Sequence, residues 1–253
     1  MNTLLVALLA GAMAIFATLS IERFGGKLGG LLGSIPTTVV PASLGFLWQS
    51  EHFEATTHAL SVVPLGMMVN AIFLYLWRVI PPTLSLTRSL SARLAIMSIE
   101  SLMVWAFCAA GLVLLLDWLP PEHVLTAGIT GQALLMTFGI WACRHHVPAP
   151  KGTRSVKISV LLSRGLLAGL AVGLSAWISG IGLPILAGMA SVFPAIFLTT
   201  MVSIWLSQGE AVQSGAVGPM MLGSSSVGAY ALLCIWTFPL GTTMGALLAW
   251  ILA

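Results

Sequence analysis

Apolar runs of about 20 residues, the length that crosses a bilayer as a helix, recur from one end of this chain to the other. Hydrophobic residues make up 58% of the 253 positions and charged residues only 7%, so a water-soluble fold would lack the polar surface to cover itself. The sequence therefore predicts an all-α polytopic membrane protein whose main partner is the lipid bilayer. It gives no reason to expect a nucleic-acid partner, and the three cysteines lack the CxxC spacing of a metal site.

Hydropathy divides the chain into about nine membrane helices. The expected spans are residues 3–20, 28–48, 55–77, 94–118, 123–143, 160–181, 183–206, 211–238 and 240–253. The last span is short for a full crossing, and a Gly-Ser-Ser-Ser run at residues 223–226 interrupts the eighth. Eight and ten helices therefore remain alternatives to nine.

The two ends of the chain repeat one another. Residues 7–36 align without a gap on residues 165–194, so that a proline closes both segments at an offset of 158 positions (194 − 36). In the polar turn that follows, Glu54 meets Glu210 at an offset of 156 (210 − 54). Apolar segments share many residues by chance, but a long ungapped match followed by a matched glutamate indicates an internal duplication.

The distribution of charge predicts how the chain is oriented. Lys and Arg gather after the expected first, third and fifth helices, whereas the turns after the second and fourth hold Glu and Asp without Lys or Arg. By the positive-inside rule the basic loops are cytoplasmic and the N-terminus lies outside, which favours a multi-pass protein of the cytoplasmic (inner) membrane.

Five crossings separate each helix of the first unit from its equivalent in the second, so the predicted repeat is inverted. A four-helix unit is used twice and the fifth helix connects the two copies. The expected organisation is a first membrane repeat at 1–118, a connecting helix with a cytoplasmic basic loop at 119–158, and a second, inverted repeat at 159–253. Inverted repeats are typical of secondary transporters.

Both predicted repeats carry a proline near the middle of a span, flanked by hydroxyl side chains. A proline removes a backbone donor and frees a carbonyl, which lipid cannot satisfy, so broken spans tend to face protein, water or substrate. The alternative is an ordinary kink whose hydroxyls bond the preceding turn. The predicted substrate-binding residues are Ser34, Pro36, Thr37, Thr38 and Pro41 in the first half, Ser191, Pro194, Thr199 and Thr200 in the second, and the repeat-related pair Asn70 and Ser225.

A second cluster of polar residues begins the expected third helix. Glu54 and His58 are four positions apart and share a helix face, a spacing that can hold one cation, with Glu51 and His52 just before them. Carboxylates with imidazoles suit a transition metal. The alternative is a solvated turn in which Glu54 is favoured by the positive end of the helix dipole.

Three further residues are candidates for gating or coupling together with Glu54. Glu210 occupies the equivalent helix start in the second half, and Gln213 lies one turn further on. Glu100 lies inside a span, where an ionisable group costs about 2.5–3.5 kcal/mol at the centre and is a functional hypothesis by default. A proton-coupling role and a structural pair with Arg164 are both open for Glu100.

These features favour a secondary active transporter of a small substrate, and within that class a small or divalent metal cation over a small polar metabolite. No catalytic motif is present, and we expect neither enzymatic activity nor a cofactor. A membrane-embedded enzyme that uses the cluster at residues 51–58, and a subunit that does not itself transport, are the other classes. The oligomeric state is open, with a homo-oligomer as one option.

Overall fold

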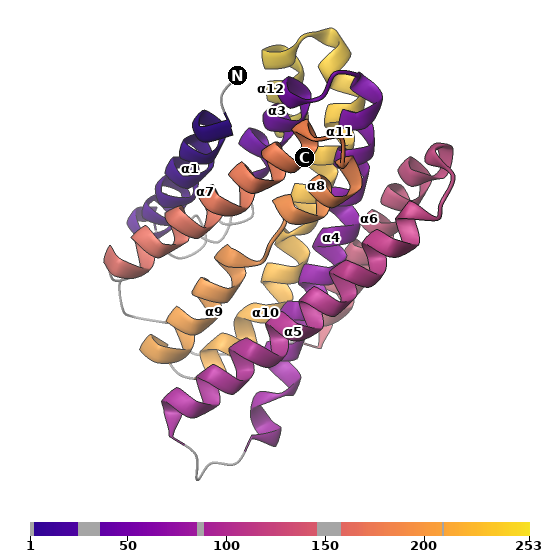
Figure 1. Ribbon diagram of the computed structural model, residues 1–253. Coiled ribbons are helices and arrows are strands. Elements are labelled where there is room, and N and C mark those ends of the chain that lie inside the picture. Colours follow the sequence, from indigo (N-terminus) through magenta and orange to yellow (C-terminus); the bar gives the residue numbers. More distant parts are fainter. Residues whose placement is uncertain (1–2, 25–35, 85–88, 146–157, 209) are drawn as a thin grey trace.

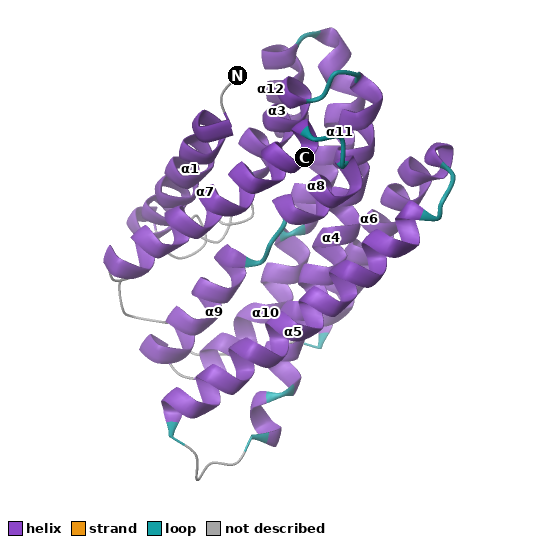
Figure 2. Ribbon diagram, in the orientation of Figure 1, coloured by secondary structure: helices purple, strands orange, loops and turns teal. Residues whose placement is uncertain are grey.

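The computed structural model describes residues 3–24, 36–84, 89–145, 158–208 and 210–253, and in these residues every regular element is a helix (Figures 1 and 2). The order is α1 (Thr3–Phe24), α3 (Val39–Gln49), α4 (Phe53–Val79), η1 (Pro81–Thr83), α5 (Leu90–Asp117), α6 (Pro121–Arg144), α7 (Ile158–Gly180), α8 (Pro184–Ser191), α9 (Ala195–Gln208), α10 (Glu210–Gly223), α11 (Ser225–Thr237), η2 (Phe238–Leu240) and α12 (Thr242–Leu252).

Six helical stretches in the described residues are long and apolar enough to cross a membrane: Phe53–Thr83, Leu90–Asp117, Pro121–Arg144, Leu161–Gly180, Pro184–Leu206 and Val212–Leu240. The protein is therefore an all-helical, polytopic membrane protein, as the sequence predicts. Two further apolar helices, Val39–Gln49 and Thr242–Leu252, are shorter than a full span, and α1 is apolar over Thr3–Phe16. The predicted count of nine spans is thus not confirmed, and residues 28–35 of the expected span at 28–48 lie outside the described residues.

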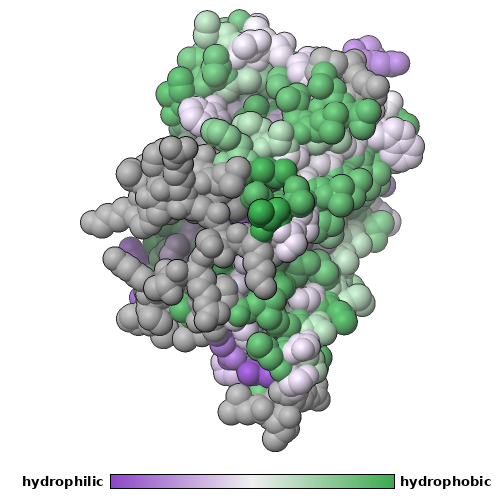
Figure 3. Space-filling model, turned by 90° about the vertical axis from the view of Figure 1, so that its left-hand side faces the viewer, coloured by the Kyte–Doolittle hydropathy of each residue, from purple (hydrophilic) through white to green (hydrophobic). Residues whose placement is uncertain are grey.

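The core of the molecule is built around α4, which packs against α6, α8, α10 and α11 (Figure 1). Its large side chains Phe73, Leu74 and Trp77 are completely buried. By contrast α5 is exposed along most of its length, and Phe107 at its middle is 82% exposed. Hydrophobic residues also cover much of the face seen in Figure 3, as expected where helices meet lipid rather than water.

One of the six stretches is broken in mid-span, and another is interrupted by a single residue. The stretch from Pro184 to Leu206 stops at Ser191 and restarts as α9 at Ala195, because Pro194 cannot donate a helical hydrogen bond (Figure 1). Between α10 and α11 the turn residue Ser224 keeps helical dihedral angles (φ −64°, ψ −19°), and its N–H donates to the carbonyl of Met220 at 2.9 Å, so this stretch runs on as one span. Pro194 therefore interrupts its span as the sequence predicts, whereas the Gly-Ser-Ser-Ser run causes only a local irregularity.

The first and sixth expected helices, α1 and α7, form an antiparallel pair at one side of the molecule (Figure 1). Glycines let the two backbones touch. A Cβ atom on Gly11 would lie 2.8 Å from the carbonyl oxygen of Gly165, and one on Gly169 would lie 2.8 Å from the carbonyl oxygen of Ala7. Close backbone approach through small residues is how membrane helices associate without a hydrophobic driving force.

Charged residues separate between the two ends of the helix bundle. Arg78 and Arg93 flank the loop between α4 and α5, Arg144 ends α6, and Arg164 lies in the second turn of α7, all toward one end (Figure 1). The turns between α3 and α4 and between α5 and α6 lie at the other end, with acidic residues and no Lys or Arg. Glu51, Glu54, Asp117 and Glu122 are the acidic residues in or beside these turns.

Candidate functional site

The break between α8 and α9 is bridged by Asn70 from the middle of α4. Its amide nitrogen Nδ2 donates to the carbonyl of Val192, 2.8 Å away, at the point where the helix is interrupted. Its oxygen Oδ1 accepts from the indole nitrogen of Trp105 on α5, also at 2.8 Å. Because Asn70 is only 2% exposed, both contacts are shielded from water and lipid. A carbonyl that the break frees is thereby satisfied, as backbone at membrane depth requires.

Aromatic rings surround this bridge on the α5 side. The ring of Trp105 meets the ring of Phe193 edge to face, with centroids 5.3 Å apart. Phe193 belongs to the break itself, and 38% of it is exposed. Trp105 was not among the residues predicted from the sequence. The one sequence signal for it is its position, five residues after Glu100 in the same span. The structure therefore adds an indole donor to the predicted pair of Asn70 and the break.

The hydroxyl side chains of the second-half break bond the preceding helical turn. Ser191 donates to the carbonyl of Gly188 at 2.7 Å, and Thr199 donates to the carbonyl of Ala195 at 2.8 Å. These are the contacts of an ordinary kink, the alternative that the sequence left open. Thr200 is half-buried and Pro194 is buried beside them. In this conformation each hydroxyl hydrogen is already used in a bond to the backbone, but each hydroxyl oxygen can still accept a hydrogen bond.

The predicted residues of the first half are only partly described. Ser34 lies outside the described residues, Pro36 and Pro41 are buried, and Thr37 and Thr38 are half-buried just before α3. The contact that joins this segment to the second half comes from Ser43, whose hydroxyl lies 3.1 Å from that of Tyr230 on α11. Both side chains are completely buried. The sequence does not predict this pair, because a single Ser and a single Tyr at distant positions do not indicate that they are in contact.

Gln132 of α6 contacts the junction between α10 and α11. Its side-chain nitrogen Nε2 donates to the carbonyl of Ser225 at 2.9 Å. The hydroxyls of Ser224 and Ser225 each donate to the carbonyl three residues back, at 2.7 Å. A carboxamide thus meets a backbone carbonyl at each of two points, Asn70 at the break after α8 and Gln132 at the junction of α10 and α11.

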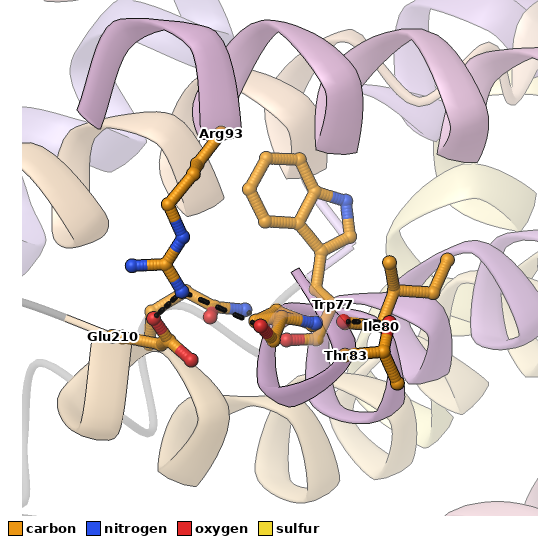
Figure 4. A network of polar contacts seen from close by, with 7 residues as sticks. Trp77, Ile80, Thr83, Arg93 and Glu210 are labelled. Carbon is orange, nitrogen blue, oxygen red and sulfur yellow. Dashed lines mark hydrogen bonds and ion pairs between the residues drawn. The ribbon is translucent and has the colours of Figure 1, made fainter. Parts of the chain in front are cut away.

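A polar network at the basic end of the bundle joins α5, α10 and the turn after α4 (Figure 4). Arg93 of α5 forms an ion pair with Glu210 of α10 at 2.6 Å and donates to the carbonyl of Pro81 at 3.3 Å. Its guanidinium also lies 5.7 Å from the ring centre of Trp205 on α9. The ring of Trp205 meets the ring of Trp77 in α4 edge to face at 5.9 Å, and the completely buried Gln213 donates from Nε2 to the carbonyl of Trp77 at 2.9 Å. Through these ring contacts the predicted gating residues Glu210 and Gln213 belong to one network that links α4, α5, α9 and α10.

The remaining predicted residues lie apart from these contacts. Glu54 is exposed and His58 is half-buried at the acidic end, and the described residues contain no group of three or more His, Cys, Asp or Glu side chains that could hold a metal ion. Glu100 is exposed on α5.

The fold and the bridged break between α8 and α9 define a polytopic helical membrane protein with a discontinuous helix. No family model matches the chain, and no curated protein and no solved structure matches it.

Proposed function

We propose that this protein is a secondary active transporter that moves a small solute by alternating access. The observation that carries the proposal is the mid-span break between α8 and α9, where Asn70 of α4 donates to the carbonyl of Val192. Discontinuous helices near the bilayer midplane are where transporters of several folds hold substrate and coupling ion. A second carboxamide, that of Gln132, donates to the carbonyl of Ser225 at the junction of α10 and α11.

The proposal includes two inverted repeats, with four helices in each and the α6 segment as connector. The contacts between α1 and α7 support it. In the proposed repeat, residues 7 and 11 correspond to residues 165 and 169. The approach of Gly11 to Gly165 and the approach of Gly169 to Ala7 are then symmetry-related contacts. A Cβ on either glycine would lie at the same distance, 2.8 Å, from the facing carbonyl oxygen. A pseudo-two-fold axis in the membrane plane, passing between Gly11 and Gly169, would produce this equality.

Contacts between the two proposed repeats are reciprocal as well. The core helix α4 of the first repeat holds the break of the second through Asn70, and α11 of the second repeat meets α3 of the first through Tyr230 and Ser43. Each proposed repeat therefore contacts a helix of the other at a buried position. In such an arrangement a change of conformation in one half is transmitted to the other, as alternating access requires.

The network of Arg93 and Glu210 is the proposed cytoplasmic gate. It ties α5 of the first repeat to α10 of the second, at the end where the basic residues gather. By the positive-inside rule that end is cytoplasmic and the N-terminus is outside. Glu54, the repeat equivalent of Glu210, is exposed at the opposite end. The structure would then represent a state closed toward the cytoplasm.

The side chains at the breaks favour one class of solute. Asn70, Trp105 and the break hydroxyls offer hydrogen-bond donors and acceptors without a formal charge. This set suits a small polar metabolite better than a divalent metal, which needs carboxylate or imidazole ligands. A metal cation stays a prediction that rests on Glu54 and His58 at the outer end.

Accessibility from the two sides of the membrane tests the mechanism. A single cysteine at position 191, in a background where the three native cysteines are replaced by Ser or Ala, is exposed to impermeant thiol reagents from either side of sealed vesicles. We expect labelling from each side, with Glu210→Gln raising the cytoplasmic rate and lowering the outer one. Labelling from one side alone, unchanged by Glu210→Gln, would refute alternating access.

Flux tests the substrate class. Proteoliposomes are loaded in turn with pools of amino acids, sugars, nucleosides and divalent metal salts, and counterflow of each labelled pool is recorded. We expect counterflow with a polar organic pool that Asn70→Leu abolishes. Counterflow with the metal pool alone would instead support the metal cation.

A further inference from the structure

The outer face of α5 carries a carboxylate at membrane depth. Glu100 is exposed on this helix, and within the part of the chain that the structure describes no hydrogen bond or ion pair holds its side chain. It lies seven residues past Arg93 (100 − 93), so it is about 10 Å further into the span. Glutamate has fewer methylene groups than Lys or Arg, which gives it less reach toward the headgroups. Ionisable groups inside membranes almost always face protein or a water-filled cavity, whereas Glu100 lies on the outside of the bundle.

α5 is the least buried of the six candidate spans, and it packs mainly against α4, with smaller contacts to α8 and α9 (Figure 1). Its exposed apolar side chains do not by themselves require a partner, because lipid covers them as well as protein does. Glu100 is the exception, since the lipid interior offers no hydrogen-bond donor to a carboxylate. A partner that covers this face must therefore satisfy a carboxyl group at the depth of Glu100.

The exposed positions of α5 follow a seven-residue repeat. Alternating steps of three and four residues reach six positions that are all exposed, namely Glu100, Met103, Phe107, Ala110, Leu114 and Asp117. These six residues are called the α5 seam. Such spacing keeps two helices in contact along a left-handed supercoil, as in most membrane helix bundles. The bulky Phe107 and Leu114, which are 82% and 64% exposed, flank the small Ala110, so the side chains of two seams can interlock.

A second copy of this chain meets the requirement of Glu100 by symmetry. Two copies inserted in the same orientation have parallel α5 helices, and a two-fold axis along the membrane normal brings equal residues together at equal depth. Each Glu100 then faces the other. Two carboxyl groups that share an apolar site can share one proton, so that the O–H of one donates to the oxygen of the other. A helix of a different protein would need its own donor at this depth.

We propose that this protein forms a parallel homodimer through the α5 seam, with the two Glu100 side chains paired across the two-fold axis. The inference goes beyond the proposed function and does not depend on it. The inner side of α5 holds Trp105, which donates to Asn70, and Arg93, which pairs with Glu210. The dimer contact thus uses the side of α5 that the break between α8 and α9 and the polar network leave uncovered.

Counting subunits in lipid tests the dimer without any transported solute. The full chain carries one fluorophore per copy and is diluted stepwise into liposomes, and the photobleaching steps of single vesicles give the fraction of dimer at each protein-to-lipid ratio. We expect this fraction to follow a monomer–dimer equilibrium. A protein that stays monomeric at every ratio, or an assembly with more than two copies, would overturn the proposal.

Variants of Glu100 separate its hydrogen bond from the packing of the seam. Glu100→Leu should raise the dissociation constant of the dimer by about 3- to 30-fold, the factor that corresponds to one polar contact between membrane helices. Glu100→Gln should keep the dimer, because two carboxamides can also donate to each other. Glu122→Leu, which removes an exposed carboxylate outside the seam, is the control and should have no effect. A Glu100→Leu protein that dimerises as the unmodified protein does would contradict the pairing.

Disulfide cross-linking in native membranes locates the interface. In the background without native cysteines, Leu114→Cys should form a cross-linked dimer under a mild oxidant, because equivalent seam positions come within the Cα distance of about 7 Å that a disulfide needs. Leu115→Cys is the matched control, since Leu115 lies at the same depth and is 67% exposed but points about 100° away from the seam. Equal cross-linking at both positions, or a cross-link from position 114 to a different protein, would refute the homodimer.

Discussion

Removal of the ion pair between Arg93 and Glu210 is the perturbation whose size the structure defines best. The two charged atoms are 2.6 Å apart, and the side chains are 11% and 31% exposed. Exposed pairs contribute about 0.2–1 kcal/mol, and breaking a fully buried pair costs about 3–5 kcal/mol. This pair lies between those limits, and Arg93 would keep its contacts to Pro81 and Trp205. We therefore expect a coupling energy of about 1–2 kcal/mol.

A double-mutant cycle isolates that energy. Arg93→Gln, Glu210→Gln and the double variant are compared with the unmodified protein by reversible unfolding in detergent. The two single variants should each destabilise the protein, and the double variant should be less unstable than their sum by about 1–2 kcal/mol. Glu122→Gln, an exposed carboxylate at the opposite end, is the control and should show no coupling to Arg93→Gln.

The same cycle tests the proposed gate. If the pair holds the cytoplasmic end closed, its loss shifts the balance of closed and open states by about 5- to 30-fold. A coupling energy below about 0.3 kcal/mol, together with unchanged thiol accessibility from the cytoplasmic side, would refute the reasoning for both the ion pair and the gate.

Three other perturbations have defined outcomes. Asn70→Leu leaves the carbonyl of Val192 and the indole of Trp105 without partners, so thermal unfolding should show a loss of about 2–4 kcal/mol. Gly11→Leu should push α1 from α7 and destabilise the protein by about 1–3 kcal/mol, whereas Gly111→Leu, where a Cβ meets open space, should be nearly neutral in the same assay. Glu54→Ala and His58→Ala should leave solute flux by the central site intact and abolish any divalent-metal uptake. Metal uptake that persists in both variants would remove the metal hypothesis.

The class of protein follows from the sequence alone, for a simple physical reason. Lipid cannot satisfy backbone polar groups, so a chain with long apolar runs and few charges must form helices. The break after α8 was predictable from Pro194, which cannot donate a helical hydrogen bond. Proline alone does not decide where a helix breaks, since Pro64 lies inside the continuous helix α4 and Pro219 inside α10. The inverted repeat and the substrate site stay predictions that await the experiments above.

Local pattern also predicted some members of the networks without their partners. Asn70 and Gln213 stand out as carboxamides in apolar spans, and Glu210 as a charge at a helix start. What they bind could not be read from spacing, because the partners lie far away in the chain. Val192 is 122 positions from Asn70, and Arg93 is 117 positions from Glu210.

The sequence by itself determined that the protein is a helical membrane protein, that a helix is interrupted at Pro194, and which residues are unusually polar for an apolar span. The tertiary structure decided which side chain meets which broken helix. It brought α4 against α8 and α6 against α10, so that Asn70 and Gln132 reach the carbonyls of Val192 and Ser225. Helix packing depends on small residues such as glycine and on shape along whole helix faces, and this information is spread over many positions rather than held in any one motif.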